Sequence, residues 1–186
     1  LVFGAAVQSY VSRTGKHPHN GPESWLTELY ELLVDLFDPF NGSMAVSALV
    51  TLICEDSGEV WYFNSEHPFP VLLRGGEASF LGNEINCRKI GFESELEFKI
   101  SRYQFEAGDM LFMGSDGKDD LILGQDPTRQ QIINEDPGLF RRIVENTGGD
   151  WGEILSRISN AGERMDDLSL VRVHWKGNAI KQVTHT

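Results

Sequence analysis

The 186-residue sequence contains only two cysteines, Cys54 and Cys87. Two cysteines are too few for a disulfide-stapled scaffold, and neither belongs to a CxxC pair of the kind that binds zinc or performs redox chemistry. We therefore expect two buried thiols in a reducing, cytoplasmic compartment. The sequence also lacks a run of about 18 apolar residues and a signal-peptide pattern, which predicts that this segment makes no contact with a membrane.

Basic residues are also scarce. The chain has 16 lysines and arginines against 28 aspartates and glutamates, which gives a formal net charge of −12 at pH 7. A surface of this sign repels phosphates, which argues against a nucleic-acid partner and an anionic membrane surface. The same excess of carboxylates is compatible with a site that binds cations.

The apolar residues that are present form a regular succession of patterns, without internal repeats or low-complexity segments. Spacing of three to four residues predicts a helix over residues 2–11 and another from Pro22 to Phe37. Two more helical stripes lie within residues 137–161, on either side of a break at Gly148-Gly149. Strand-like patterns cover residues 48–54, 59–64, 69–74, a short stretch ending at residue 81, 85–90, 95–100, 110–113 and 168–175.

This order of elements predicts an α+β fold in which helices cover the faces of antiparallel sheets. The number of strands favours two packed sheets over one. The length is that of one domain with a sizeable core, over residues 1–176, and the polar residues 177–186 predict a mobile tail. Because Leu1 lies in mid-pattern, we expect the chain to be a fragment of a longer protein.

The pattern that organises the sequence is an apolar run, Met110 to Met113, which ends in Gly-Ser-Asp-Gly. The run predicts a buried strand, and Asp116 follows where that strand leaves the core. Gly117 then allows the backbone to turn or to approach a ligand closely. A carboxylate at this position can hold a hard cation, although Ser-Asp-Gly is also common chemistry for an ordinary turn.

A second carboxylate cluster, Asp166-Asp167, comes fifty residues later and precedes the last predicted strand. If the two strands are antiparallel neighbours, the end of one lies beside the start of the other. Asp116 and Asp166 would then meet at one sheet edge, where their oxygens and water could bind magnesium or manganese.

Three histidines offer competing interpretations. His17 and His19 are two residues apart in a loop that contains proline, and no third metal ligand lies nearby, so we interpret them as solvated. His67 could act as a general acid, but its place between a strand and Pro68 favours a structural role.

Three segments, in this order, resemble motifs of the PPM-type metal-dependent protein phosphatases, in the bacterial branch of SpoIIE, RsbU and RsbX. Residues 64–73, Asn-Ser-Glu-His-Pro-Phe-Pro-Val-Leu-Leu, resemble the Asn-Ala-Gly-His-x-Pro-Pro-Leu-Leu segment of this family, with Glu66 in place of glycine. Residues 108–117 resemble its Gly-Asp, apolar strand, Ser/Thr-Asp-Gly motif. Residues 166–171 resemble its closing Asp-Asp-Ile-Thr-Leu-Val motif.

The resemblance implies an α-β-β-α sandwich of two antiparallel sheets flanked by helices. It implies that Asp116 and Asp166 are ligands of two divalent cations, Mn²⁺ or Mg²⁺, with Gly117 and Asp167 beside them. The reaction would be hydrolysis of a phosphoserine or phosphothreonine ester by water that the cations activate. The implied substrate is a partner-switching phosphoprotein of the anti-sigma-antagonist kind, and a sensor domain is expected N-terminal to this segment.

One part of the resemblance is missing. The first metal motif of the family, Asp-x-x-Gly-His-Gly, precedes a helix of small residues that corresponds here to residues 2–11, so the motif would lie before Leu1. Without the motif, the chain is either a phosphatase domain that lacks its N-terminal part or a catalytically inactive module that binds a partner through the same fold.

Overall fold

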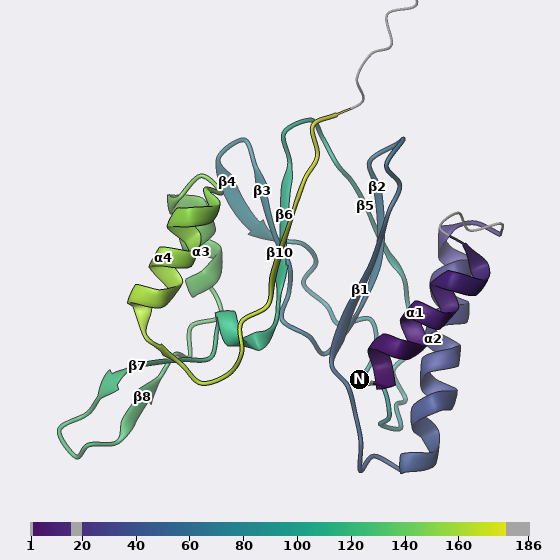
Figure 1. Ribbon diagram of the computed structural model, residues 1–186, viewed down its shortest axis with the longest axis horizontal. Helices are drawn as coiled ribbons and strands as arrows, with labels where there is room; N and C mark the ends of the chain where they lie inside the picture. Colours follow the sequence, from purple (N-terminus) through teal and green to yellow (C-terminus); the bar gives the residue numbers. More distant parts are fainter. Residues whose placement is uncertain (1, 16–19, 178–186) are drawn as a thin grey trace, which may run out of the picture. The chain divides into compact units, whose positions relative to one another are not determined.

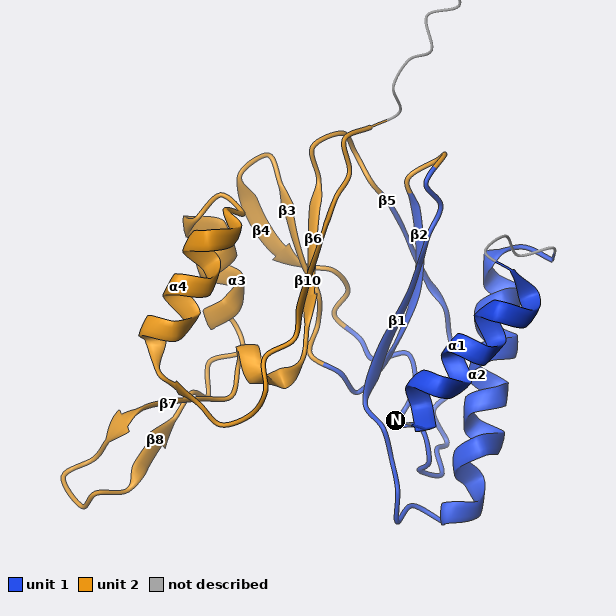
Figure 2. Ribbon diagram, viewed as in Figure 1, with its two compact units in different colours: residues 1–55, 59–67, 84–104 blue, residues 56–58, 68–83, 105–186 orange. Residues whose placement is uncertain are grey.

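The computed structural model describes residues 2–15 and 20–177, and Figure 1 shows how its elements are arranged. His17, His19 and the predicted tail beyond Gly177 lie outside these residues. The elements form two compact units, coloured separately in Figure 2. Unit 1 comprises residues 1–55, 59–67 and 84–104, and unit 2 comprises residues 56–58, 68–83 and 105–186. In the described part of the chain, no helix is long and apolar enough to cross a membrane.

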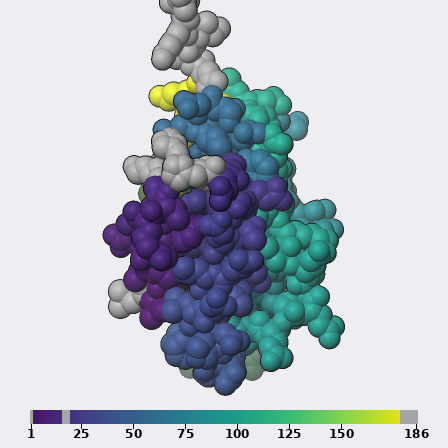
Figure 3. All heavy atoms as spheres, turned by 90° about the vertical axis from the view of Figure 1, so that its right-hand side faces the viewer, coloured from purple at the N-terminus to yellow at the C-terminus, as the bar shows by residue number. Residues whose placement is uncertain are grey.

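Unit 1 consists of two helices packed on a three-stranded antiparallel sheet. The helices are α1 (Val2–Thr14) and α2 (Pro22–Phe37), which is followed by the short 3-10 helix η1 (Asp38–Phe40). The sheet has the order β1-β2-β5, from β1 (Ala48–Ile53), β2 (Glu59–Ser65) and β5 (Ser101–Gln104). Figure 3 shows α1 and α2 side by side on one face of this unit.

The apolar stripe of α2 forms the core of unit 1, as the periodicity predicts. Proline in the first turn suits the start of this helix because its missing N–H needs no partner there. Four side chains along the helix are buried and pack with Phe63 of β2. These four are Leu26, Leu29, Leu33 and Phe37.

Unit 2 is built around a four-stranded antiparallel sheet of order β10-β6-β3-β4. Its strands are β3 (Val71–Arg74), β4 (Glu77–Phe80), β6 (Met110–Gly114) and β10 (Leu170–His174). Helices α3 (Leu139–Asn146) and α4 (Trp151–Ala161) bury their apolar side chains against this sheet, around Phe112 and Phe140. The apolar run Met110 to Met113 therefore belongs to an inner strand of the sheet, with Leu111 and Phe112 buried as predicted, and the α+β class is confirmed.

The strands predicted at residues 85–90 and 95–100 are wrong. Within residues 85–90 the structure has only isolated bridges, Val46 with Ile90 and Ser65 with Cys87, and the next strand, β5, begins at Ser101. The apolar alternation of residues 95–100 instead serves packing, since Phe98 stacks on Tyr30 of α2 with the ring centroids 3.8 Å apart. An alternating pattern therefore marked a coil segment that lies against a helix.

The prediction of two buried thiols is half right. Cys87 is fully buried, and burial raises its pKa to about 11. Cys54, which directly follows β1, is only half-buried. A thiol that is buried and protonated at neutral pH is inert, so Cys87 serves as a small apolar core residue.

Unit 2 also contains a small sheet that the sequence patterns did not predict. It has the order β8-β7-β9, from β7 (Leu121–Gln125), β8 (Gln131–Ile133) and β9 (Glu163–Arg164). A register shift between Ile122 and Gly124 interrupts the pairing of β7 with β8. Such an irregularity breaks the strict alternation on which strand recognition depends, which explains why the pattern gave no signal.

Candidate metal centre

The two acidic segments come together because β6 and β10 are antiparallel neighbours. Their register pairs Gly114, the last residue of β6, with Leu170, the first residue of β10. The chain leaving β6 forms the short 3-10 helix η2 (Asp116–Lys118), and the chain entering β10 carries Asp166 and Asp167. The sheet edge predicted from the sequence therefore exists, within unit 2.

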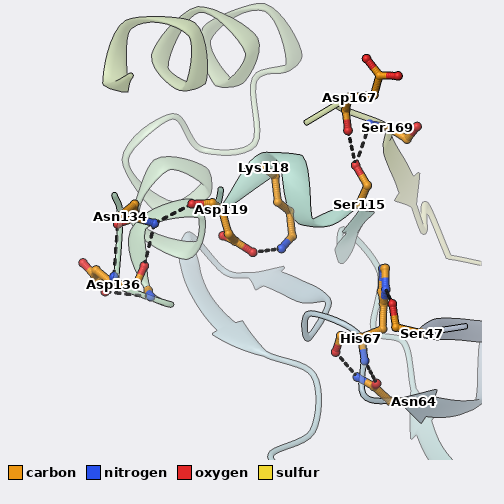
Figure 4. A network of polar contacts seen from close by, with 11 residues as sticks. Ser47, Asn64, His67, Ser115, Lys118, Asp119, Asn134, Asp136, Asp167 and Ser169 are labelled. Atoms are coloured by element: carbon orange, nitrogen blue, oxygen red, sulfur yellow. Dashed lines mark hydrogen bonds and ion pairs between the residues drawn. The ribbon is translucent and has the colours of Figure 1, made fainter. Parts of the chain in front are cut away.

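Ser115 binds the two segments to each other beyond the last strand pair. Its backbone N–H donates to the carbonyl of Ser169 at 2.9 Å, and its hydroxyl donates to the carbonyl of Asp167 at 2.9 Å. The same hydroxyl accepts a hydrogen bond from the N–H of Ser169 at 3.0 Å (Figure 4). Ser115, which belongs to a sequence typical of turns, thus joins the acidic segments by three hydrogen bonds.

Gly117 is buried where the two segments approach most closely. A Cβ atom at this position would lie 2.5 Å from the carbonyl oxygen of Asp167 and 3.1 Å from that of Asp166. Backbone atoms cannot move aside as the end of a flexible side chain can. Gly117 is therefore required for close backbone approach and not for an unusual turn conformation.

The carboxylates themselves face solvent. Asp116, Asp166 and Asp167 are all exposed. The carboxylate of Asp166 accepts a hydrogen bond from the N–H of Asp167 at 2.7 Å. Among the described residues, neither Asp116 nor Asp166 is paired with a lysine or arginine, so their oxygens remain available to a cation.

The donor set fits a hard divalent cation in type and falls short in number. Carboxylate oxygens suit Mg²⁺ and Mn²⁺, and neither cysteine nor histidine lies beside Asp116, Asp166 or Asp167 in the sequence. However, the described residues contain no group of three or more His, Cys, Asp or Glu side chains placed to hold a metal ion. The assignment of Asp116 and Asp166 as ligands, with Gly117 and Asp167 beside them, stays a prediction.

Sequence reasoning missed a buried ion pair in the same turn. The side chain of Lys118 is only 2% exposed, forms a salt bridge with Asp119, and lies 5.4 Å from the ring centre of Phe140. Burial raises the pKa of Asp119, and the Lys118 ammonium opposes that shift. The one signal in the sequence is a lysine among carboxylates, and its burial depends on Phe140, which lies 22 residues further along the chain.

Asp119 is also fixed through its backbone. Its carbonyl accepts a hydrogen bond from the side-chain amide of Asn134 at 2.9 Å (Figure 4). The carbonyl of Asp116 accepts from the N–H groups of Asp119 and Asp120, which closes the turn on itself. The turn that carries Asp116 is therefore anchored in the core of unit 2 through Lys118.

His67 lies in unit 1, at the end of the segment that carries Asn64. The side chain of Asn64, which is fully buried, accepts from the N–H of His67 at 2.7 Å and donates to the carbonyl of the same residue at 2.9 Å. His67 Nδ1 lies 3.5 Å from the hydroxyl of Ser47. These contacts fix the backbone of the motif, in line with the structural role expected for His67.

The backbone conformation at Glu66 explains why the corresponding family motif has a glycine at this position. Its backbone has φ of 46°, the left-handed region that favours glycine. Here a glutamate tolerates this conformation and forms a salt bridge with Arg88. The substitution therefore keeps the turn and adds a charged contact.

The family sequence model described as Stage II sporulation protein E (SpoIIE) matches residues 2–176 of this chain. The chain belongs to the SpoIIE family. It is thus a PPM-type phosphatase domain of the branch that the three motifs indicated. No curated protein sequence matches the chain.

Solved structures agree with the SpoIIE assignment at the level of fold. The PP2C domain of SiaA from Pseudomonas aeruginosa has a TM-score of 0.68 at 12% identity, over 93% of this chain and 67% of that one. The catalytic domain of the serine/threonine phosphatase PstP, in complex with two manganese ions, has a TM-score of 0.61 at 12% identity, over 94% and 81%.

A third structure contains the RsbU and RsbW domains of a Mycobacterium tuberculosis protein. Its TM-score is 0.64 at 18% identity, over 82% of this chain. This chain spans 42% of that longer structure. At such identities, these likenesses establish a shared fold.

Replacing Gly117 by alanine tests the close approach of the two acidic segments. The added Cβ would collide with the carbonyl of Asp167, so we expect the free energy of unfolding to fall by about 2 kcal/mol, a typical cost of overpacking. Urea denaturation measures the change. The control is Gly152→Ala in α4, whose Cβ would lie an ordinary 3.5 Å from Asp150 and should be neutral or stabilising. Equal effects of the two substitutions would contradict the contact.

The buried pair of Lys118 and Asp119 predicts strong coupling between two substitutions. Asp119→Asn leaves the Lys118 ammonium buried and uncompensated, which should destabilise the fold by about 3 kcal/mol. Lys118→Met combined with Asp119→Asn removes both charges and should cost less than the sum of the single changes. A double-mutant cycle of unfolding free energies measures this coupling. Additive effects would show that the two side chains do not interact.

Proposed function

We propose that the natural protein carrying this domain is a manganese- or magnesium-dependent serine/threonine protein phosphatase. The observation that carries the proposal is the link formed by Ser115 and Gly117, which joins the segments of Asp116 and Asp166 at one sheet edge of a SpoIIE-family domain. The solved PstP structure with two manganese ions supports the choice of divalent cations.

In this proposal, the chain supplies placement and negative charge. Asp116 and Asp166 offer exposed carboxylate oxygens, and the anchored turn restricts the position of Asp116 before any cation binds. Asp116 and Asp166 would hold the divalent cations, which would supply an activated water and charge neutralisation for the phosphoryl oxygens. Gly117 keeps the segments close, and Asp167 donates its N–H to Asp166, which orients that carboxylate.

The proposed substrate is a phosphoserine or phosphothreonine protein of the anti-sigma-antagonist kind. Membership of the SpoIIE family and the fold shared with an RsbU domain that is joined to an RsbW domain support a place in a partner-switching system. We place the domain in the cytoplasm, under the control of a sensor domain elsewhere in the natural protein.

A second function has one observation in its favour. Because no group of three metal-binding side chains occurs among the described residues, the domain could act without catalysis, as a module that binds a partner through the same surface. A further carboxylate ligand from the rest of the natural protein would favour the enzyme, and its absence would favour the binding module.

Charge removal at the two carboxylates distinguishes these functions. Asp116→Asn keeps the side-chain size and deletes a negative charge, so cations should bind more weakly. We expect manganese-dependent hydrolysis of a phosphoserine substrate by the natural full-length protein to fall at least a hundredfold, about 3 kcal/mol in barrier terms. Asp166→Asn should behave similarly.

The measurement is the initial rate against manganese concentration, with circular dichroism to confirm folding. Glu66→Ala is the control, because Glu66 pairs with Arg88 and belongs to neither acidic segment, so it should lose far less activity. Near-parental activity of folded Asp116→Asn would refute the role of that residue. A parent without any metal-dependent activity would favour the binding module.

A further inference from the structure

The small sheet β8-β7-β9, which we call the arm sheet, exposes large apolar side chains. Leu123, Ile132 and Ile133 are 47%, 46% and 44% exposed, and Met165 directly after β9 is 51% exposed. Successive residues of a strand point to opposite faces, so Ile132 and Ile133 expose apolar surface on both faces of β8. A hairpin of this kind is marginally stable by itself, and a bound partner would stabilise it.

One edge of the arm sheet is open. β8 pairs with β7 on one side, and no other strand of the described chain pairs with it on the other. Residues 130–134, Gln-Gln-Ile-Ile-Asn, contain no charged residue and no proline, which are the usual means of blocking an edge strand. Such an edge can accept an extended polypeptide as an additional strand.

The arm sheet is continuous with the candidate metal centre. β7 begins directly after the acidic turn, and β9 ends two residues before Asp166. The N–H of Met165 donates to the carbonyl of Asp120 at 3.0 Å, and the side chain of Asn134 donates to the carbonyl of Asp119. A polypeptide lying on this sheet would therefore place a neighbouring residue close to Asp116 and Asp166.

The charge around the arm sheet selects the partner. Residues 116–136 and 163–167 together contain nine acidic and three basic side chains, and one of the basic ones, Lys118, is buried in its pair with Asp119. This surface attracts basic segments and repels acidic ones. The chain itself is strongly acidic, which argues against a second copy as the partner.

We propose that the arm sheet docks an extended, basic and apolar segment next to the phosphorylated residue of the protein substrate. The segment adds to the open edge of β8, its apolar side chains cover Ile132 and Ile133, and its basic side chains face the acidic rim. This inference rests on the proposed phosphatase function, because it assigns the partner by its nearness to the candidate metal centre.

Peptide binding tests this docking without relying on catalysis. The protein is the natural full-length chain in EDTA, and the probe is a fluorescein-labelled, unphosphorylated peptide in which valine and arginine alternate around one serine. Fluorescence anisotropy should show at least tenfold weaker binding of a matched peptide with glutamate in place of arginine. Ile132→Lys combined with Ile133→Lys should weaken binding of the basic peptide at least fivefold.

Leu155→Lys is the matched control, because Leu155 is an exposed leucine of α4 in the same unit and should leave binding unchanged. Hydrolysis of p-nitrophenyl phosphate with manganese, measured separately, should be the same for the β8 variant and the parent. If the parent does not hydrolyse p-nitrophenyl phosphate, the phosphatase function is refuted, but the peptide-binding result remains valid.

Two outcomes would overturn the docking proposal. One is equal affinity of the parent and a folded β8 variant for the basic peptide, or no preference for arginine over glutamate. The other is sedimentation evidence that the parent forms a dimer that the β8 variant abolishes, because the open edge would then belong to a second copy of the chain.

Discussion

The candidate site depends on one backbone contact, the approach of the turn after β6 to the residues before β10. The contact is possible because Gly117 has no side chain. The hydroxyl of Ser115 stabilises the contact by hydrogen bonds with Asp167 and Ser169 of the approaching segment. Antiparallel pairing of β6 with β10 brings the segments near, but the strands end at Gly114 and Leu170. Beyond these strand ends, the hydrogen bonds of Ser115 and the close approach at Gly117 link the residues that carry the carboxylates.

A second constraint fixes the acidic turn from the side of the core. Lys118 extends from the acidic turn into the core of unit 2, where it meets Asp119 and the ring of Phe140. A buried charge pair is a weak source of net stability, but it is costly to break, so it favours one arrangement of the turn over others. Lys118 thus neutralises Asp119 within the turn, while the carboxylate of Asp116 remains exposed.

The sequence predicted those helices and strands whose apolar side chains are buried in the way that their spacing indicates. The α2 stripe around Leu29 and the central strand around Phe112 are buried as expected, and the meeting of the two acidic segments followed from antiparallel order. The segment around Phe98 failed, because its alternation meets an aromatic ring on a helix and not a neighbouring strand. The arm sheet was missed since its pairing shifts register near Leu123 and most of its side chains, unlike the buried Leu121, are exposed.

The site shows the same division between what is local and what is not. Asp116 and Asp166 were found because one follows a strand-like run and the other precedes one, while the burial of Lys118 depends on Phe140, which no local pattern connects to it. A crystal structure of the natural full-length protein grown with manganese tests the metal centre most directly. Anomalous scattering should place manganese about 2–2.5 Å from carboxylate oxygens of Asp116 and Asp166. Manganese bound elsewhere, or a separation of the two carboxylates beyond about 12 Å, would contradict a shared metal centre.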